Sequence, residues 1–220
     1  MGDWIEIDGR HGPVRGWHAA PDGGAAGGLV LIQEIFGVNG HIRDVAERFA
    51  REGFEVIAPS LFDPIERGVE LGYDDAGIAR GRELAAAIGM ERAVDMVDAA
   101  AMRLRVPGRH VGAAGFCWGG SVALLANTRL GLPAVSYYGA RSVPLLDEPL
   151  RAPMLLHFGE HDASIPAEQV DLHRRKLPTA EIHVYDAGHG FNCDRRADYQ
   201  PDAAAQAWTR TVDFLRRSLA

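Results

Sequence analysis

The sequence predicts an α/β fold in which a mostly parallel central sheet carries helices on both faces and follows an antiparallel hairpin. Short β-rich segments alternate with longer helical patterns along most of the 220 residues, which indicates crossover connections between parallel strands. Two short apolar segments near the N-terminus are joined by a turn-forming stretch, as in a hairpin. Because 47% of the residues are hydrophobic, the chain can form one sizeable core but is short for two. We therefore expect a single domain over residues 1–220.

The expected elements follow in a regular order. The hairpin pairs residues 4–7 with residues 14–17 across a turn that contains Gly9, Gly12 and Pro13. Further strands are expected over residues 29–32, 54–58, 110–114, 134–138, 154–158 and 181–185, and helices over residues 42–51, 119–128, 167–176 and 203–219. Between Ser60 and Asp75 the pattern gives way to Pro, Gly and Asp. This predicts a long loop above the sheet, and long loops in compact domains are often functional.

Composition argues against several classes of partner. The net charge of −7 comes from acids and bases mixed along the chain, so we expect no nucleic acid partner. The apolar stretches are interrupted well before the roughly 18 residues of a membrane span, so we expect no membrane association. Cys117 and Cys193 are the two cysteines, and the N-terminus is acidic where a signal peptide would be basic. A cytoplasmic protein without disulfides is therefore expected. The glycine-rich residues 21–28 lack the ending of a phosphate-binding loop.

Cys117 lies in the turn Gly115-Phe116-Cys117-Trp118-Gly119, between an apolar strand and a helix rich in small residues. This is the setting of a nucleophile elbow, with cysteine in the place that serine usually holds. Glycines two positions on either side leave room for the strained turn, and the N-terminus of a helix favours a thiolate. A small buried packing residue is the alternative role for Cys117. The residues that follow favour the nucleophile.

A cysteine nucleophile needs a base, and the base needs a group that orients it. Asp162 follows the strand over residues 154–158, and His189 lies between glycines after the strand over residues 181–185. Nucleophile, acid and histidine then occur in the chain order of α/β-hydrolase triads, which predicts an α/β-hydrolase fold. Glu160 is the rival for the acid, but Asp162 lies further past its strand.

Other histidines are less favoured. His161 adjoins the proposed acid, and His157 lies within an apolar strand, where a packed histidine is the ordinary expectation. A metal site built from His157, His161, His189 and Cys193 fits no zinc signature. We therefore expect no metal.

Glu34 follows the strand over residues 29–32, at the edge of the sheet where ligands bind in such folds. An acid between two apolar runs is either a solvated charge or placed for a role. If it is buried, the protonated form is favoured and can exchange a proton with the thiol. In this fold the oxyanion hole combines the amide after the nucleophile with one from an early loop, which here indicates Trp118 and Ile35.

Three motifs together resemble the dienelactone hydrolase family, a branch of the α/β-hydrolases. They are Gln-Glu-Ile-Phe-Gly at residues 33–37, Gly-Phe-Cys-Trp-Gly-Gly at residues 115–120 and Gly-His-Gly-Phe at residues 188–191. The resemblance spans essentially the whole chain, including residues 58–62. It implies Cys117 as nucleophile, His189 as base, Asp162 as the residue that orients it, and Glu34 as the acid that contacts the thiol. It also implies that no cofactor is needed.

Family members that act on dienelactone bind its carboxylate with arginines. One lies in the helix after the long loop and one shortly after the catalytic histidine, which by resemblance indicates Arg80 or Arg82 and Arg195 or Arg196. The match is loose, because residues 190–193 separate His189 from the second pair. Each arginine has an alternative role as a solvated charge.

The resemblance implies a hydrolase that converts dienelactone to maleylacetate in aromatic degradation, through an acyl-enzyme on Cys117. The partner would be a small-molecule lactone or ester. A broad carboxylesterase or thioesterase on the same residues is the alternative. A non-catalytic binding protein of this fold is disfavoured, because it would not be expected to retain Cys117, Asp162, His189 and Glu34 together.

Overall fold

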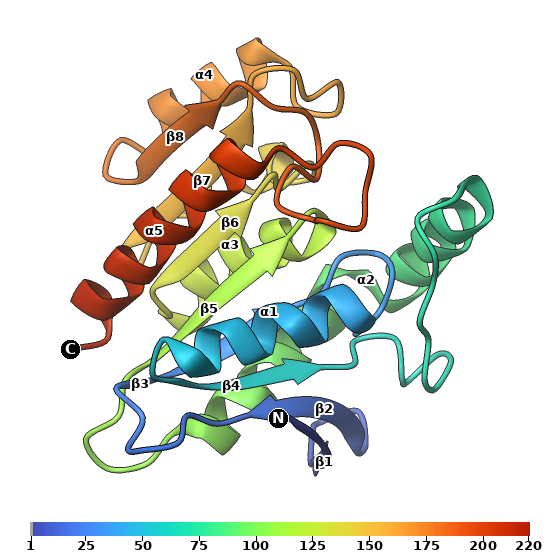
Figure 1. Ribbon diagram of the computed structural model, residues 1–220, viewed down its shortest axis with the longest axis vertical. Helices are drawn as coiled ribbons and strands as arrows, with labels where there is room; N and C mark the ends of the chain where they lie inside the picture. Colours follow the sequence, from blue (N-terminus) through green and yellow to red (C-terminus); the bar gives the residue numbers. More distant parts are fainter. Residues whose placement is uncertain (1) are drawn as a thin grey trace.

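One eight-stranded sheet organises the computed structural model, which describes residues 2–220 (Figure 1). The strands are β1 Asp3–Ile7, β2 Val14–Ala19, β3 Gly27–Ile32, β4 Phe54–Pro59, β5 Val111–Phe116, β6 Ala134–Tyr137, β7 Met154–Gly159 and β8 Glu181–Tyr185. Their order across the sheet is β1-β2-β4-β3-β5-β6-β7-β8. β1 pairs antiparallel with β2, and β2 pairs antiparallel with β4, whereas the other pairs are parallel. The predicted fold class is confirmed.

Helices cover both faces of the sheet. The helices are α1 Gly40–Arg51, α2 Asp75–Leu104, α3 Trp118–Leu130, α4 Ala167–Lys176 and α5 Pro201–Ser218, with a short 3-10 helix, η1 Val143–Leu145. In Figure 1, α1 and α5 lie in front of the sheet, and α2, α3 and α4 lie behind it. Every residue of β3, β5 and β7 is buried, as expected of parallel strands that are covered on both faces.

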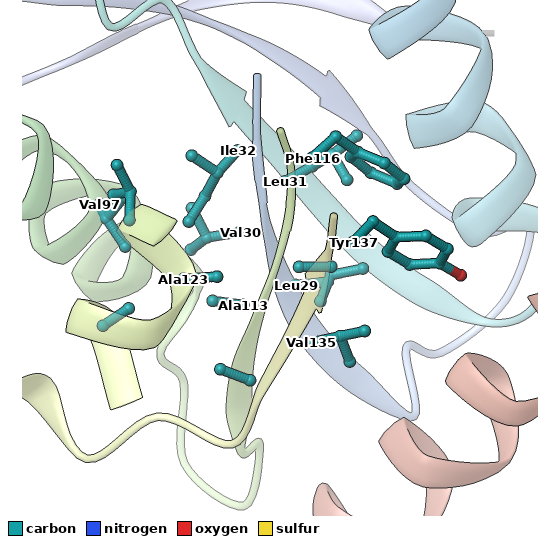
Figure 2. Close-up of a cluster of buried hydrophobic side chains, with 14 of the residues drawn as sticks. Leu29, Val30, Leu31, Ile32, Val97, Ala113, Phe116, Ala123, Val135 and Tyr137 are labelled. Carbon is teal, nitrogen blue, oxygen red and sulfur yellow. The ribbon is translucent and has the colours of Figure 1, made fainter. Parts of the chain in front are cut away.

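The core continues through the sheet. Figure 2 shows alternate residues of β3 pointing to opposite sides, Leu29 and Leu31 to one and Val30 and Ile32 to the other. The first pair lies on the side of Phe116, Val135 and Tyr137, and the second on the side of Val97 and Ala123. Burying one such aliphatic side chain contributes about 1.5–3 kcal/mol. This rigid centre holds the ends of β3 and β5 in register.

The sequence pattern gave no bounds for α2, which is the longest helix of the described chain at 30 residues. Gly89 interrupts it with φ 70, so that it consists of two sections. At Gly81 a Cβ would lie 2.2 Å from the carbonyl oxygen of Ile35, so glycine allows the first section to approach the loop after β3. The second section packs against the core through Ala93, Val97 and Ala101.

The segment between β4 and α2 forms turns above the sheet, as expected. Gly37 forms an isolated antiparallel bridge with Glu70, and the Leu71 amide donates to the Phe36 carbonyl oxygen. These contacts join the segment to the loop after β3. That loop is therefore held from two directions, by this segment and by Gly81 of α2.

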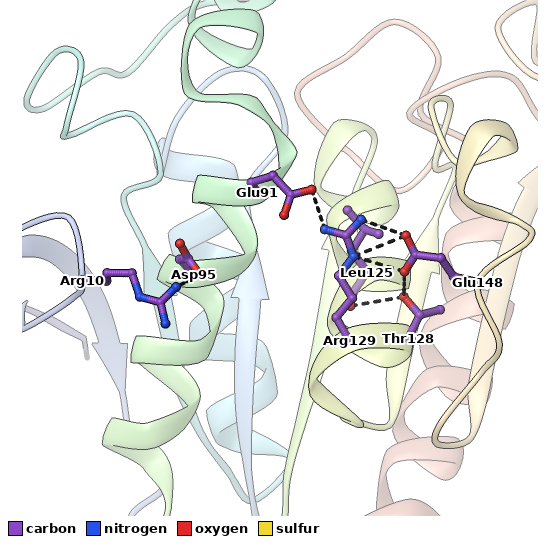
Figure 3. A network of polar contacts seen from close by, with 7 residues as sticks. All are labelled: Arg10, Glu91, Asp95, Leu125, Thr128, Arg129 and Glu148. Atoms are coloured by element: carbon purple, nitrogen blue, oxygen red, sulfur yellow. Dashed lines mark hydrogen bonds and ion pairs between the residues drawn. The ribbon is translucent and has the colours of Figure 1, made fainter.

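A charged network joins α2, α3 and the segment after η1 on the outside of the molecule (Figure 3). The Arg129 guanidinium donates to Glu148 at 2.8 Å and to Glu91 at 2.6 Å, and the Thr128 hydroxyl donates to Glu148 at 2.7 Å. Elsewhere, Asp95 of α2 forms an ion pair with Arg10, which lies between β1 and β2. Within residues 2–220, the helices are too short or too polar to cross a membrane.

Candidate active site

Cys117 lies between β5 and α3 with φ 53 and ψ −120, a backbone conformation that residues other than glycine rarely adopt. The glycines on either side allow it. A Cβ at Gly115 would lie 2.0 Å from the Gly119 carbonyl oxygen, and one at Gly119 would lie 2.3 Å from the Gln33 carbonyl oxygen. The turn therefore presents the thiol at the N-terminus of α3, where the helix dipole favours negative charge.

Three loops at the carboxyl ends of β5, β7 and β8 bring Cys117, Asp162 and His189 together. The His189 Nε2 atom lies 3.1 Å from Cys117 Sγ, and the His189 Nδ1 atom lies 2.7 Å from Asp162 Oδ2. The other Asp162 oxygen accepts the Ser164 amide at 2.8 Å. Glu160, the rival acid, is exposed. Asp162 is the acid that this arrangement joins to His189.

The environment of His189 favours its protonated form. Burial alone lowers the pKa of His189, but its hydrogen bonds to Asp162 and Cys117 outweigh burial and raise the pKa to about 10. A histidine in such a position accepts a proton from the thiol readily and holds it as an imidazolium. The arrangement is therefore suited to form a thiolate–imidazolium pair.

Glu34 is fully buried in the loop after β3. Among residues 2–220, neither of its carboxylate oxygens has a hydrogen-bond partner. Arg196 is its nearest cation, with Nη1 3.6 Å from Glu34 Oε1. Over the same residues no hydrogen bond joins Glu34 to Cys117, because the thiol is directed to His189. Within residues 2–220, the hydrogen bond between Glu34 and the thiol that the resemblance implied is therefore not present.

The expected oxyanion donors flank the elbow. Ile35 follows Glu34 in the loop after β3, and Trp118 is the first residue of α3. In the described part of the chain, neither amide donates to a backbone carbonyl or a side chain. Both residues line the same pocket as Cys117, so their N–H groups are available near the thiol.

A pocket of about 450 Å³ opens over Cys117 and His189, a size suited to a small ligand. Phe36, Ile78 and Ala140 give it apolar walls, and Arg82, Arg141 and Arg196 add positive charge. Arg82 belongs to the first section of α2, and Arg196 to the loop between β8 and α5.

The other two expected arginines point elsewhere. Arg80 forms ion pairs with Glu66 and Glu83, and Arg195 forms one with Asp44. Neither lines the pocket. Of each pair named from the sequence, one member reaches the pocket, because neighbouring residues on a helix or turn point in different directions.

Sequence reasoning missed Arg141. It follows β6 closely, at the same sheet edge as the other site residues, and that position was the available signal. Cys193 is fully buried outside the pocket. Burial and the charge of Glu34 raise the pKa of Cys193 to about 11, so its thiol is a poor nucleophile.

Comparisons with known proteins identify the family of the chain. The model of the dienelactone hydrolase family matches residues 14–219. A Rhodococcus opacus protein named carboxymethylenebutenolidase is 33% identical over 228 residues, which cover 94% of this chain and 87% of that protein. A Synechocystis protein that bears the same name provisionally is 34% identical over 214 residues, covering 87% of this chain and 86% of the relative. A crystal structure of a provisionally named dienelactone hydrolase from Klebsiella pneumoniae superposes with a TM-score of 0.83 at 31% identity, covering 97% of each chain.

Proposed function

The chain belongs to the dienelactone hydrolase family, and on that premise we propose that it hydrolyses a lactone bearing a carboxylate, most simply dienelactone to maleylacetate. Membership of this family makes the protein a carboxylic ester hydrolase. The observation that carries the proposal is the chain of hydrogen bonds from Cys117 through His189 to Asp162, at 3.1 and 2.7 Å. These residues meet the geometric requirements of nucleophile, base and orienting acid.

In the proposed first step, His189 takes the thiol proton and Cys117 Sγ forms a bond to the lactone carbonyl carbon. The carbonyl electron pair moves onto the oxygen, which accepts hydrogen bonds from the Ile35 and Trp118 amides. Donors placed for such an oxyanion are worth about 10²–10³ in kcat each. Collapse of the intermediate breaks the ring C–O bond, and the enolate oxygen leaves with its electron pair and becomes a ketone after protonation.

In the second step, water releases the acyl group. His189 gives its proton to the leaving enolate and then removes one from a water molecule, which attacks the thioester carbon. The C–S bond breaks, the thiol is restored and a carboxylate is released. Asp162 holds the imidazole orientation through both steps.

Positive charge in the pocket supports the proposal that the substrate bears a carboxylate. Arg82 and Arg196 line the pocket from two different segments, and we propose that they bind the substrate carboxylate. Arg196 is also the nearest cation to Glu34. A substrate carboxylate would compete for Arg196 and leave the buried Glu34 charge uncompensated, which would favour proton transfer from the thiol to Glu34 or to His189.

A test compares steady-state hydrolysis of cis and trans dienelactone with that of p-nitrophenyl acetate. Wild type is expected to cleave a dienelactone isomer at higher kcat/KM than the simple ester, and Cys117→Ala to lose at least about 10⁴-fold in kcat for both, as nucleophile removal does in triad hydrolases. Arg82→Met should raise KM for dienelactone alone. Wild-type turnover in Cys117→Ala would show that another residue is the nucleophile.

A broad carboxylesterase or thioesterase is the second candidate, because Arg82 and Arg141 are exposed at the pocket rim and need not engage every substrate. Equal kcat/KM for charged and uncharged esters would favour it.

A further inference from the structure

Three side chains that can bind metal meet in the interior beside the catalytic pocket. Glu34 comes from the loop after β3, His41 from the first turn of α1 and Cys193 from the loop between β8 and α5. One carboxylate oxygen, one imidazole nitrogen and the sulfur all lie within 4.8 Å of one another. All three residues are buried. The fold thus gathers oxygen, nitrogen and sulfur ligands from three separate segments.

Two of these groups lack partners. Glu34 is 0% exposed and His41 is 2% exposed. Within the described chain, both Glu34 oxygens and the His41 Nε2 atom have no hydrogen-bond partner. Buried polar atoms in folded proteins are nearly always satisfied, and a bare buried carboxylate is costly. A shared cation would satisfy the imidazole nitrogen and one of the carboxylate oxygens at once.

We propose that Glu34, His41 and Cys193 form a zinc site. Zinc takes thiolate, imidazole and carboxylate ligands at about 2.0–2.3 Å in tetrahedral geometry. Those lengths put the ligand atoms roughly 3.3–3.6 Å apart, so side-chain shifts of about 1 Å close the cluster. A thiolate ligand disfavours calcium and magnesium, which prefer oxygen. The fourth position is left for water.

Charge and surroundings fit the same ion. A carboxylate and a thiolate together balance the two positive charges of zinc, with a neutral imidazole as third ligand. The other His41 nitrogen, Nδ1, lies 3.7 Å from Asp194 Oδ1, and a carboxylate behind a ligating histidine is the usual support of a zinc site. Arg196 opposes binding through its position 3.6 Å from Glu34. Zinc would therefore compete with Arg196 for Glu34.

The test uses Cys117→Ala, which removes the catalytic thiol and leaves Cys193 as the single cysteine. Equilibrium dialysis is expected to give about one zinc ion per chain. Substitution of Co²⁺ should give thiolate-to-metal charge-transfer absorption. Adding Cys193→Ala should abolish that absorption and weaken zinc binding by at least about tenfold, as should adding His41→Ala. The readouts are binding and absorption, so they are independent of turnover and of the proposed function.

Controls separate the outcomes. His161→Ala removes an exposed histidine paired with Asp186 and should leave zinc binding unchanged. Metal-free thermal unfolding reports whether each variant folds. If His41→Ala does not fold, Asp194→Asn tests the site from the surface, with an expected loss of roughly tenfold. Zinc binding that disappears with Cys117→Ala and survives Cys193→Ala would overturn the proposal in favour of the catalytic pair. Absence of zinc binding in every variant would overturn the proposal.

Discussion

Two polar regions of this protein differ in how completely their charged groups are paired. Around Arg129, at the surface between α2 and α3, each charged group has a partner of opposite sign (Figure 3). Around Glu34, beside the catalytic pocket, the carboxylate is fully buried without a hydrogen bond from the described chain, and its cation lies 3.6 Å away. Satisfied charges hold elements together, whereas unsatisfied buried charges cost stability and are kept for function. The difference indicates that the sheet edge at Cys117 is built for chemistry at some expense of stability.

The largest expected effect follows substitution of Asp162, the proposed orienting acid. Asp162→Asn should lower kcat about 10³–10⁴-fold, because an amide can hold His189 in the wrong tautomer. Steady-state hydrolysis of p-nitrophenyl acetate measures the change. Glu160→Gln, two residues away and exposed, should retain wild-type kcat. An Asp162→Asn variant with more than a tenth of wild-type kcat would remove Asp162 from the site.

The next largest effect is on the pH dependence of the free energy of unfolding. The folded-state pKa of His189, about 10, lies above the ordinary value of 6.5 because its hydrogen bonds to Asp162 and Cys117 outweigh burial. The folded state therefore binds the proton more tightly than the unfolded state. Its contribution to the free energy of unfolding is fully present below about pH 6.5 and is lost as the pH rises toward 10.

Urea unfolding of wild type and Asp162→Asn at pH 6, 8 and 10 measures this contribution. The difference between the two proteins should shrink as the pH rises. A difference that is constant from pH 6 to 10 would contradict the raised pKa.

Glu34→Gln tests the unsatisfied region itself. An amide is cheaper to bury than a carboxylate without donors, so the free energy of unfolding should rise by about 1 kcal/mol. The kcat should fall by about 10²-fold, the low end of the range for residues in proton transfer. Urea unfolding and steady-state kinetics measure the two changes. Destabilisation by about 3 kcal/mol or more would mean that the ion pair with Arg196 stabilises the fold.

The smallest effect is expected in the satisfied region. Glu148→Gln removes the carboxylate whose two oxygens both accept from Arg129 and should lower the free energy of unfolding by about 0.5–1 kcal/mol, with kcat unchanged. Asp171→Asn, which breaks the exposed pair with Arg174, is the matched control and should cost less than about 0.5 kcal/mol. Equal costs would show that the network adds nothing beyond a single surface pair.

Local patterns predicted the strands and most helices, because continuous apolar runs and turn residues mark buried parallel strands. The bounds of the long helix α2 were not predicted from the sequence. Gly77, Gly81 and Gly89 interrupt its helical pattern of apolar residues, and its buried residues are divided between two sections. The strand–turn–helix around Cys117 was readable because its glycines are required by contacts within the same motif and with Gln33.

Residues that meet from distant segments were harder to predict. The order of Cys117, Asp162 and His189 was available from known triads, and the structure joins them by hydrogen bonds. Choosing Arg82 over Arg80, or Arg196 over Arg195, depends on which way each side chain leaves its backbone. The meeting of His41 and Cys193 with Glu34 depends on the approach of two loops and the first turn of α1, for which one sequence carries no signal.

The interruption of α2 at Gly89 affects how the substrate specificity of this enzyme can change. Its φ of 70 separates the section of α2 that carries Ile78 and Arg82 into the pocket from the section that packs against the core. Evolution or a laboratory library can therefore vary the pocket-lining positions of this first section, such as Ile78 and Arg82, while Gly81, Leu84 and Ile88 keep the section attached to the core. New specificity then needs no redesign of the sheet.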